Sequence, residues 1–421
     1  MDFFRFLMSD VLSEPAVLVG LIALIGLIGL IAQKKPVTEC IKGTVKTIMG
    51  FVILGAGAGL VVSSLGDFAN IFQHAFGIQG VVPNNEAIVS VAQKSFGKEM
   101  AMIMFFAMVI NIMIARFTPW KFIFLTGHHT LFMSMMVAVI LATAGMTGIT
   151  LIAVGSLVVG VAMVFFPAIA HPYMKKVTGS DDVAIGHFST LSYVLAGFIG
   201  SKFGNKEHST EDMNVPKSLL FLRDTPVAIS FTMSIIFLVT CLFAGADAVK
   251  ELSGGKNWFM FSIMQSITFA AGVYIILQGV RMVIAEIVPA FKGISDKLVP
   301  NARPALDCPV VFPYAPNAVL VGFLSSFAAG LIGMFTLYLL NMIVIIPGVV
   351  PHFFVGAAAG VFGNATGGRR GAILGAFAQG LLITFLPVFL LPVLGDIGFA
   401  NTTFSDADFG ALGILLGIIV R

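Results

Sequence analysis

Apolar runs of about twenty residues recur along this chain and constrain its fold more than any other feature. A helix that crosses a bilayer needs about 20 mostly apolar residues. Eleven segments match this pattern, near residues 16–33, 47–66, 99–116, 122–142, 147–168, 225–246, 258–284, 318–341, 349–366, 371–395 and 405–420. We therefore predict an all-α polytopic membrane protein with about 11 transmembrane helices.

The composition leads to the same fold class. Apolar residues make up 58% of the chain and charged residues only 11%, whereas soluble domains are about 25% charged. The net charge of +3 is spread over short loops, which indicates no nucleic-acid partner. Cys40, Cys241 and Cys308 lack the spacing of a disulfide framework or a metal site, so we expect no metal or other cofactor.

The charged loop residues predict an orientation in the membrane. If the N-terminus is external, the cytoplasmic loops contain pairs and clusters of basic residues, including Lys34, Lys35, Arg116, Lys121, Lys175, Lys176, Arg369 and Arg370. The opposite segments contain Asp67, Asp247, Asp396, Asp406 and Asp408. Basic residues concentrate on the cytoplasmic side of membrane proteins. We therefore expect an external N-terminus and a cytoplasmic C-terminus, with a first helix that is retained rather than cleaved as a signal.

Three stretches fit neither a plain spanning helix nor a plain loop. They cover residues 76–97, 181–204 and 299–316, and each mixes apolar residues with polar residues and with Gly or Pro. Irregular backbone at membrane depth survives only where it is buried in protein or lines a wet cavity. In transporters such broken segments line the substrate site. We interpret them as re-entrant hairpins or broken helices, and polar loops of mixed hydrophobicity are the alternative.

Five ionisable residues are candidates for binding a substrate. Glu86, His187 and Asp307 lie in these stretches, and His128 and His129 lie at the start of a predicted span. Ionisable side chains within a membrane are costly and usually functional. A neutral imidazole can both donate and accept a hydrogen bond, which suits a hydroxylated solute. The alternatives are a solvated turn for Glu86 and capped or interfacial positions for His128 and His129.

Two further patterns bear on organisation and energy supply. The segment VVPNN at 81–85 is echoed by LVPNA at 298–302, which suggests two related halves, repeat 1 at about 16–204 and repeat 2 at about 225–421, within one integral membrane domain. No nucleotide-binding G-x-x-x-x-G-K-[ST] motif is present in the sequence. Energy for transport would therefore come from a partner protein or an ion gradient.

Several motifs together resemble one family. They are CIKGTVKTIMGFVILGAGAGLV at 40–61, LTGH at 125–128, IGH at 185–187, GVRMVIAEIVPAFKGISDKLVPNARPALDC at 279–308 and YAPNAVLVGF at 314–323. With these motifs the chain resembles the ascorbate-type enzyme IIC permeases of the bacterial phosphotransferase system over nearly its whole length.

The resemblance implies a homodimer in the bacterial inner membrane, with a substrate-holding core domain and a V-shaped dimerisation domain. It implies transport of a sugar-like acid that is phosphorylated on release by a separate cytoplasmic IIB subunit, which IIA charges. The permease itself would be the membrane component of this phosphotransferase and would carry no phosphoryl group.

The resemblance also assigns residues. His128 matches the family's TGH histidine, His187 its IGH histidine, and Asp307 the aspartate of its D-C segment. We expect Asp307 or His187 to position, and to deprotonate, the hydroxyl that attacks the phosphoryl group.

Four positions depart from the ascorbate pattern. Phe132 and Phe188 stand where that pattern has Gln, and Asn85 and Glu86 stand where it has a Thr-Tyr pair. Each lost amide removes two donors and an acceptor. The ring of L-ascorbate or a related sugar acid would then stack on Phe, or the substrate would be a neutral pentose or alditol, which Glu86 would not repel.

Two other classes of function remain open from the sequence. An ion-coupled secondary transporter would use Glu86 and Asp307 as proton carriers. A membrane receptor or scaffold would not transport at all.

Overall fold

The computed structural model describes residues 34–77, 80–214, 224–395 and 402–420, together with positions 27, 30, 31, 218, 221 and 222. The first predicted span, at 16–33, lies almost entirely outside the described residues. The described α-helices are α3 (Val37–Phe76), α4 (Asn85–Phe117), α5 (Gly127–Thr143), α6 (Gly148–Thr178), α7 (Thr190–Phe203), α8 (Thr225–Ala244), α9 (Ala246–Leu252), α10 (Trp258–Leu298), α11 (Pro316–Leu339), α12 (Val349–Leu394) and α13 (Ala407–Val420).

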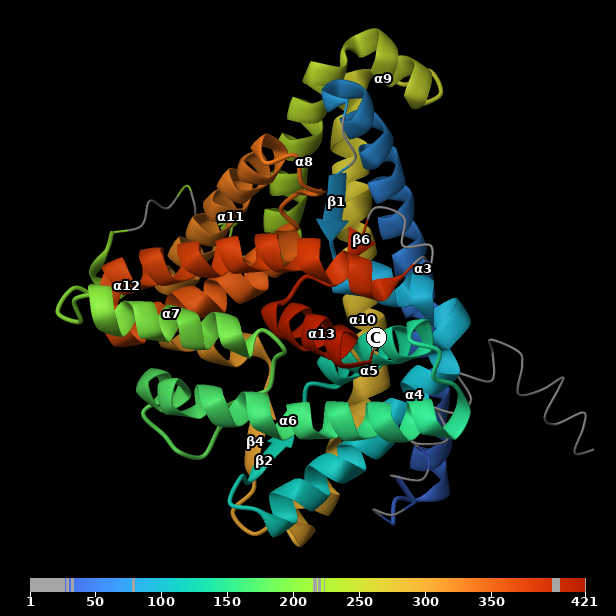
Figure 1. Ribbon diagram of the computed structural model, residues 1–421, viewed down its shortest axis with the longest axis vertical. Helices are drawn as coiled ribbons and strands as arrows, with labels where there is room; N and C mark the ends of the chain where they lie inside the picture. The colour runs from blue at the N-terminus through green and yellow to red at the C-terminus, as the bar shows by residue number, and fades with distance from the viewer. Residues whose placement is uncertain are drawn as a thin grey trace, which may run out of the picture.

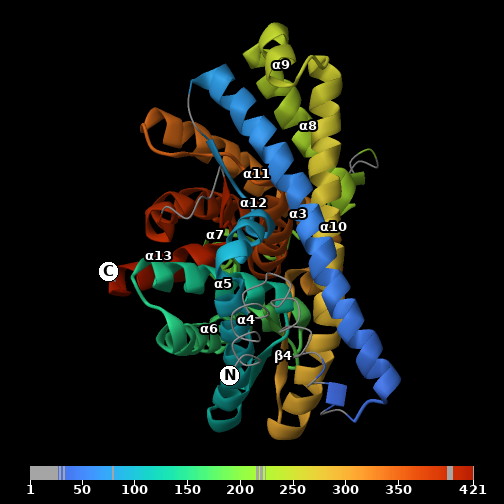
Figure 2. The same cartoon turned by 90° about the vertical axis from the view of Figure 1, so that its right-hand side faces the viewer.

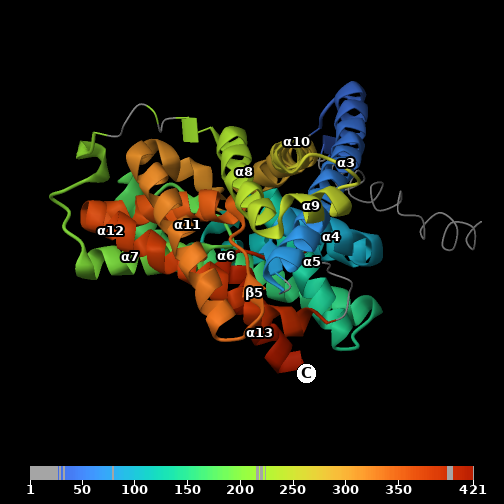
Figure 3. The same cartoon turned by 90° about the horizontal axis from the view of Figure 1, so that it is seen from above.

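Two very long helices form one edge of the molecule. Helices α3 and α10 pack against each other and against α8, and in Figure 2 both run along almost the full height of the protein. Their contact buries apolar side chains such as Phe68, Phe237 and Phe269. Seen from above in Figure 3, α7, α11 and α12 lie at the opposite end from α3 and α10. We call α3, α8 and α10 the helical edge.

Six of the described helices are long and apolar enough to cross a membrane. They lie within α4, α6, α8, α10, α11 and α12, while α5 and α13 are apolar but shorter. This length and composition confirm the predicted class, a helical membrane protein with several spans. The count of eleven spans and the V-shaped dimerisation domain stay predictions.

Helix α12 is two helices joined by a sharp turn. Gly367 and Gly368 have non-helical backbone angles, and Gly368 has a φ of +60°. A methyl group on Gly363 would overlap the carbonyl oxygen of Gly371, which shows that the chain folds back on itself there. The turn separates the segments predicted as independent spans at 349–366 and 371–395.

Short parallel strands, which the sequence did not predict, join the helices. They are β1 (Gly80–Pro83), β2 (Phe122–Phe124), β3 (Ala184–Ile185), β4 (Arg303–Leu306), β5 (Val344–Ile345) and β6 (Thr402–Thr403). One sheet has the order β5-β1-β6 and the other the order β2-β4-β3. Strands of two to four residues are too short for an alternating apolar pattern to be recognised.

Each strand leads directly into a helix, and this arrangement defines the centre of the molecule. β1 leads to α4, β2 to α5, β3 to α7, β5 to α12 and β6 to α13, while β4 leads to the 3₁₀ helix η4 (Cys308–Tyr314) and then α11. Figure 1 shows β2 and β4 below and β1 and β6 above the central helices. The three interrupted stretches of the sequence contain β1, β3 and β4, so their polar residues follow strand ends.

Candidate functional site

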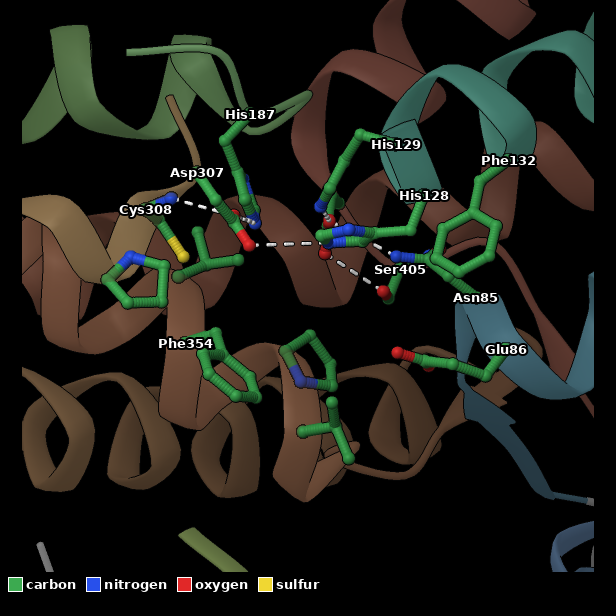
Figure 4. A pocket seen from close by; sticks show the side chains of 15 residues that line it. Asn85, Glu86, His128, His129, Phe132, His187, Asp307, Cys308, Phe354 and Ser405 are labelled. Carbon is green, nitrogen blue, oxygen red and sulfur yellow. Dashed lines mark hydrogen bonds and ion pairs between the residues drawn. The ribbon is translucent and has the colours of Figure 1, made fainter. Parts of the chain in front are cut away.

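A cavity of about 250 Å³ lies where the ends of both sheets meet (Figure 4). Its polar lining consists of side chains that follow five of the six strands, namely Asn85 and Glu86 after β1, His128 and His129 after β2, His187 after β3, Asp307 after β4, and Ser405 and Asp406 after β6. Val350 and Pro351, after β5, contribute an apolar part of the wall. Backbone segments that are far apart in the sequence therefore build one site.

Seven of the eight residues expected to bind substrate line this cavity: Asn85, Glu86, His128, His129, Phe132, His187 and Asp307. Phe188 does not line it. The Phe188 ring is fully buried and stacks on Phe124, with ring centroids 4.6 Å apart. Phe132 therefore lies where a bound ring could contact it, whereas the ring of Phe188 does not.

Phe188 contributes through its backbone instead. Its N–H donates to Nδ1 of His129 at 3.2 Å. A backbone N–H can only donate, so Nδ1 of His129 accepts, and the neutral ring carries its proton on Nε2. That Nε2 faces Oδ2 of Asp406 at 3.9 Å. The separation is longer than an N–H···O hydrogen bond of 2.7–3.2 Å.

Asp307 lies between two imidazoles. Its Oδ2 is 3.4 Å from Nε2 of His128, and its Oδ1 is 3.8 Å from Nε2 of His187. The backbone N–H of Cys308 donates to Oδ1 at 2.7 Å, which fixes the carboxylate at the start of η4. Gly186, next to His187, allows the two segments that carry His187 and Asp307 to lie close together, because a methyl group at Gly186 would overlap the backbone of Ala305 in β4.

The opposite wall is held by a buried hydrogen-bond network that the sequence did not reveal. Asn85 Nδ2 donates to Asp406 Oδ2 at 3.1 Å, and Ser405 N donates to Asn85 Oδ1 at 2.9 Å. Ser405 Oγ donates to the second oxygen of Asp406 at 2.9 Å. Asn85 therefore orients Asp406. Asp406 is among the residues expected as external loop charges, but its side chain is only 4% exposed and lines the cavity.

Asp408, which is likewise among the residues expected as external loop charges, is fully buried. Its two carboxylate oxygens accept hydrogen bonds from the N–H groups of Thr190 and Leu191, each at 2.8 Å, so it caps the start of α7. The Asp408 N–H donates to the carbonyl of Phe188 at 3.1 Å. The start of α13 thus braces the chain that carries His187. A carboxylate in the first turn of a helix is expected to interact with its own helix, so no local signal marks Asp408 as the cap of α7.

A charged cluster lies at the other end of the β2-β4-β3 sheet. Asp181, shortly before β3, accepts hydrogen bonds from His171 at 2.7 Å and from Arg303 at 2.6 Å, and it pairs with Lys175 at 3.1 Å. The bond with His171, together with those from Lys175 and Arg303, holds the pKa of Asp181 well below its usual range. Arg303 begins β4, so the cluster joins the two strands that lead to His187 and Asp307.

A second, more open hollow adjoins the cavity. Both are lined by His128, Asp307 and Pro309, and the second also by Thr126 and Leu306. Asp307 therefore lies at the boundary between the two. Its side chain is 37% exposed, in contrast to 4% for His187.

Three groups of side chains in the cavity place possible metal ligands within 4.8 Å of one another, and two of them include His129. A metal ion needs a lone pair on the nitrogen that it binds. Because Nδ1 of His129 accepts from Phe188, its Nε2 carries a proton. At this position the hydrogen bonding favours a hydroxyl group over a metal ion.

Comparison with known proteins places the chain in a family. Residues 10–408 match the family model EIIC-GAT, described as the "PTS system sugar-specific permease component". The chain is also similar to the "Ascorbate-specific PTS system EIIC component" of Mycoplasma pneumoniae, with 27% identity over 462 aligned positions that cover 96% of this chain and 67% of the relative. The family match spans nearly the whole chain and includes the six segments that line the cavity up to Asp406. The chain belongs to the family of sugar-specific permease components of the phosphotransferase system.

Proposed function

We propose that the cavity binds a small sugar-like substrate, L-ascorbate or a related sugar acid, and that the protein carries it across the membrane while a separate IIB subunit phosphorylates it. The family match supports a sugar permease. The ascorbate assignment rests on the name of the Mycoplasma pneumoniae relative. IIB, charged by IIA, is the partner expected of such a permease.

The alternation of donors and acceptors around the cavity carries this proposal. His129 Nε2 and Asp406 Oδ2 are 3.9 Å apart, and His187 Nε2 and Asp307 Oδ1 are 3.8 Å apart. A hydroxyl oxygen about 2.8 Å from both members of a pair would accept from the imidazole and donate to the carboxylate. Two such pairs suit a molecule that presents several hydroxyl groups.

The charges around the cavity are mixed. Glu86, Asp307 and Asp406 are acidic, and no Lys or Arg is among the lining residues. The first turns of α4, α5 and α12 also reach the cavity, and helix N-termini carry partial positive charge. An anionic sugar acid meets both signs of charge here. A neutral pentose or alditol is the competing substrate, favoured by the three carboxyl groups.

Asp307 is placed to act in phosphoryl transfer. In this step the substrate hydroxyl oxygen bonds to phosphorus, the bond from phosphorus to IIB breaks, and the hydroxyl proton passes to a base. Asp307 lies at the boundary between the cavity and the more open hollow, through which IIB would approach. Most of the rate enhancement would come from positioning and electrostatics rather than from the base alone.

We further propose that the chain consists of two related halves. Numbering β1, β2, β3 as the strands of the first half and β4, β5, β6 as those of the second, each sheet has a central first strand flanked by strands two and three of the other half. The long helices α3 and α10 precede the two central strands. This order supports an internal repeat. A dimer in the bacterial membrane, with external N-terminus and cytoplasmic C-terminus, belongs to the same proposal.

A thermal-shift screen of the purified protein tests the substrate assignment. L-ascorbate, D-gluconate, xylitol and D-arabinitol are compared at equal concentrations, with sodium chloride as the ionic control. A ligand at 100 times its Kd stabilises the protein by about 2.7 kcal/mol. A shift with L-ascorbate and not with the pentitols supports the sugar-acid assignment. The reverse result assigns a neutral alditol.

Transport in vesicles separates group translocation from ion coupling. With phosphoenolpyruvate, IIA and IIB supplied, uptake should yield a phosphorylated product and should persist when a protonophore collapses the proton gradient. Uptake of unmodified substrate that the protonophore abolishes would instead indicate a secondary transporter with Glu86 and Asp307 as proton carriers. A scaffold would show neither uptake nor a thermal shift.

A further inference from the structure

Tyr193, outside the cavity, makes direct contact with one of its histidines. It lies in α7, six residues after His187, and its side chain is fully buried. Its hydroxyl oxygen is 2.8 Å from Nδ1 of His187, and its ring stacks on Phe362 with centroids 5.2 Å apart. Tyr193 therefore binds the ring nitrogen of His187 that is not directed at Asp307.

The direction of this hydrogen bond decides what His187 offers to a substrate. If the phenol donates to Nδ1, the neutral ring carries its proton on Nε2, which faces Asp307 at 3.8 Å. If Nδ1 donates to the phenol, Nε2 has a lone pair and acts as an acceptor. These two forms give the cavity opposite chemistry at the same position.

The surroundings of Tyr193 favour the first form. A buried phenol O–H needs an acceptor. Among the described residues, Nδ1 of His187 is the nitrogen or oxygen atom that forms a hydrogen bond with this hydroxyl, at 2.8 Å. A neutral imidazole nitrogen without a proton is a good acceptor. The phenol proton therefore goes to Nδ1 of His187.

We propose that Tyr193 is a positioning residue that fixes the tautomer of His187 and makes its Nε2 a hydrogen-bond donor to a substrate hydroxyl. His129 is set in the same form by the Phe188 N–H. Both imidazoles then donate, and the carboxylates opposite them accept. His187 is thereby excluded as the proton acceptor of phosphoryl transfer, which leaves Asp307 in that role. The effect of Tyr193 on uptake rests on the proposed function, whereas the tautomer of His187 does not depend on it.

The tautomer can be read without any substrate. In protein labelled with ¹⁵N-histidine, the His187 signals are assigned by their absence in His187→Gln, and the nitrogen shifts report which nitrogen carries the proton. We expect the Nε2–H form in the wild type and a rise of the Nδ1–H form in Tyr193→Phe. The proposal is overturned if wild-type His187 is in the Nδ1–H form, and this result needs no variant of Tyr193 to fold.

A double-mutant cycle measures the consequence for transport, with L-ascorbate as the probe. Tyr193→Phe keeps the ring that stacks on Phe362 and removes only the hydroxyl. Loss of one neutral hydrogen bond should raise the KM for uptake about 3- to 10-fold. In the His187→Gln background, which has no imidazole tautomer to fix, the same change should have almost no effect. Equal losses in both backgrounds would show a merely structural role and overturn the proposal.

Tyr173→Phe is the matched control. Tyr173 lies in α6, and its ring packs where a methyl group on Gly197 of α7 would lie, so the change removes a hydroxyl near the same helix. We expect wild-type KM and an unchanged His187 spectrum. If L-ascorbate is not transported at all, the proposed substrate fails, while the His187 spectrum still decides the role of Tyr193.

Discussion

The two sheets share one architecture but bring different chemistry to the cavity. Each has three short parallel strands, and the strands lead into helices at the cavity. The β2-β4-β3 sheet ends in His128, His187 and Asp307. The β5-β1-β6 sheet ends in the carboxamide of Asn85, the hydroxyl of Ser405, the carboxyl groups of Glu86 and Asp406, and the apolar start of α12. The arrangement of the strands therefore determines where the side chains lie, and the residue type after each strand determines which groups face the cavity.

The two sheets also differ in how they are held. The β2-β4-β3 sheet is held at its start, the end opposite the cavity, by the charged cluster around the half-exposed Asp181. The β5-β1-β6 sheet is joined at its end by the buried network of Asn85, Ser405 and Asp406, which is itself part of the wall. Disturbing the first support should act on the site weakly and indirectly, whereas disturbing the second should change substrate binding directly.

The largest effect is expected for Asp307→Asn, at the end of the β2-β4-β3 sheet. The amide cannot accept a proton and presents a donor to His187 or His128. Phosphoenolpyruvate-dependent uptake should fall about 100-fold, the lower end of the range for general acid–base groups. Asp182→Asn is the control, because Asp182 is exposed and, in the part of the chain that the structure describes, its side chain accepts a hydrogen bond from Ser180 alone. Uptake at the wild-type rate would exclude Asp307 from the reaction.

A smaller effect is expected for Asp406→Asn, at the end of the β5-β1-β6 sheet. Its carboxylate accepts from both Ser405 and Asn85, and an amide can accept at only one of these positions. The KM for uptake should rise about tenfold, as expected for loss of one charge-assisted hydrogen bond. The turnover of bound substrate should change less, since Asp307 is untouched. A drop in turnover with unchanged KM would contradict the assignment of Asp406 to binding.

Asp408→Ala should act mainly on stability. The change leaves two N–H groups of α7 without their acceptor, and loss of an N-cap costs about 0.5–2 kcal/mol. Thermal unfolding in detergent should show a lower midpoint, and Asp408→Asn should lower it less because its amide oxygen can still accept. If both variants unfold like the wild type, Asp408 does not brace the His187 segment.

The smallest effect is expected for Asp181→Asn. The folded-state pKa of Asp181 is depressed, so its stabilising contribution is present above the ordinary Asp pKa of about 3.9 and is lost as the pH falls through the lower folded value. The difference in unfolding midpoint between wild type and variant should therefore not shrink between pH 8 and pH 5. Uptake should change less than threefold, since exposed ion pairs contribute little. If Asp181→Asn impaired uptake as much as Asp406→Asn does, the charged cluster would affect the site as strongly as the buried network, and the comparison of the two sheets would be wrong.

Much of the site could be predicted because its residues are chemically out of place in their surroundings. His128, His187 and Asp307 are ionisable groups in apolar segments interrupted by Gly and Pro, and such groups are rare unless they function. The spans that became α4, α6 and α11 were recognisable because a spanning helix needs a long apolar run. The two spans within α12 were recognisable because Arg369 and Arg370 interrupt that run.

The missed features depend on contacts between distant segments. Asp406 and Asp408 stand next to a short apolar run and look like solvated loop charges until β6 pairs with β1 and brings them inside. The ring of Phe188 could have pointed into the cavity, but it packs against Phe124, Phe166 and Phe409 instead. Tyr193 lies in an apolar helix, where nothing local marks its hydroxyl as the partner of a histidine.

By itself, the sequence determined that this chain is a helical membrane protein of the sugar-permease family, and it predicted a few histidines and one aspartate that line the cavity. Hydrophobic length and the cost of burying charge are local properties, and the sequence states them directly. The tertiary structure decided which strand ends meet, which carboxylates join the cavity and which nitrogen of each histidine faces it. Those outcomes follow from hydrogen bonds between residues up to 321 positions apart, and no local pattern encodes them.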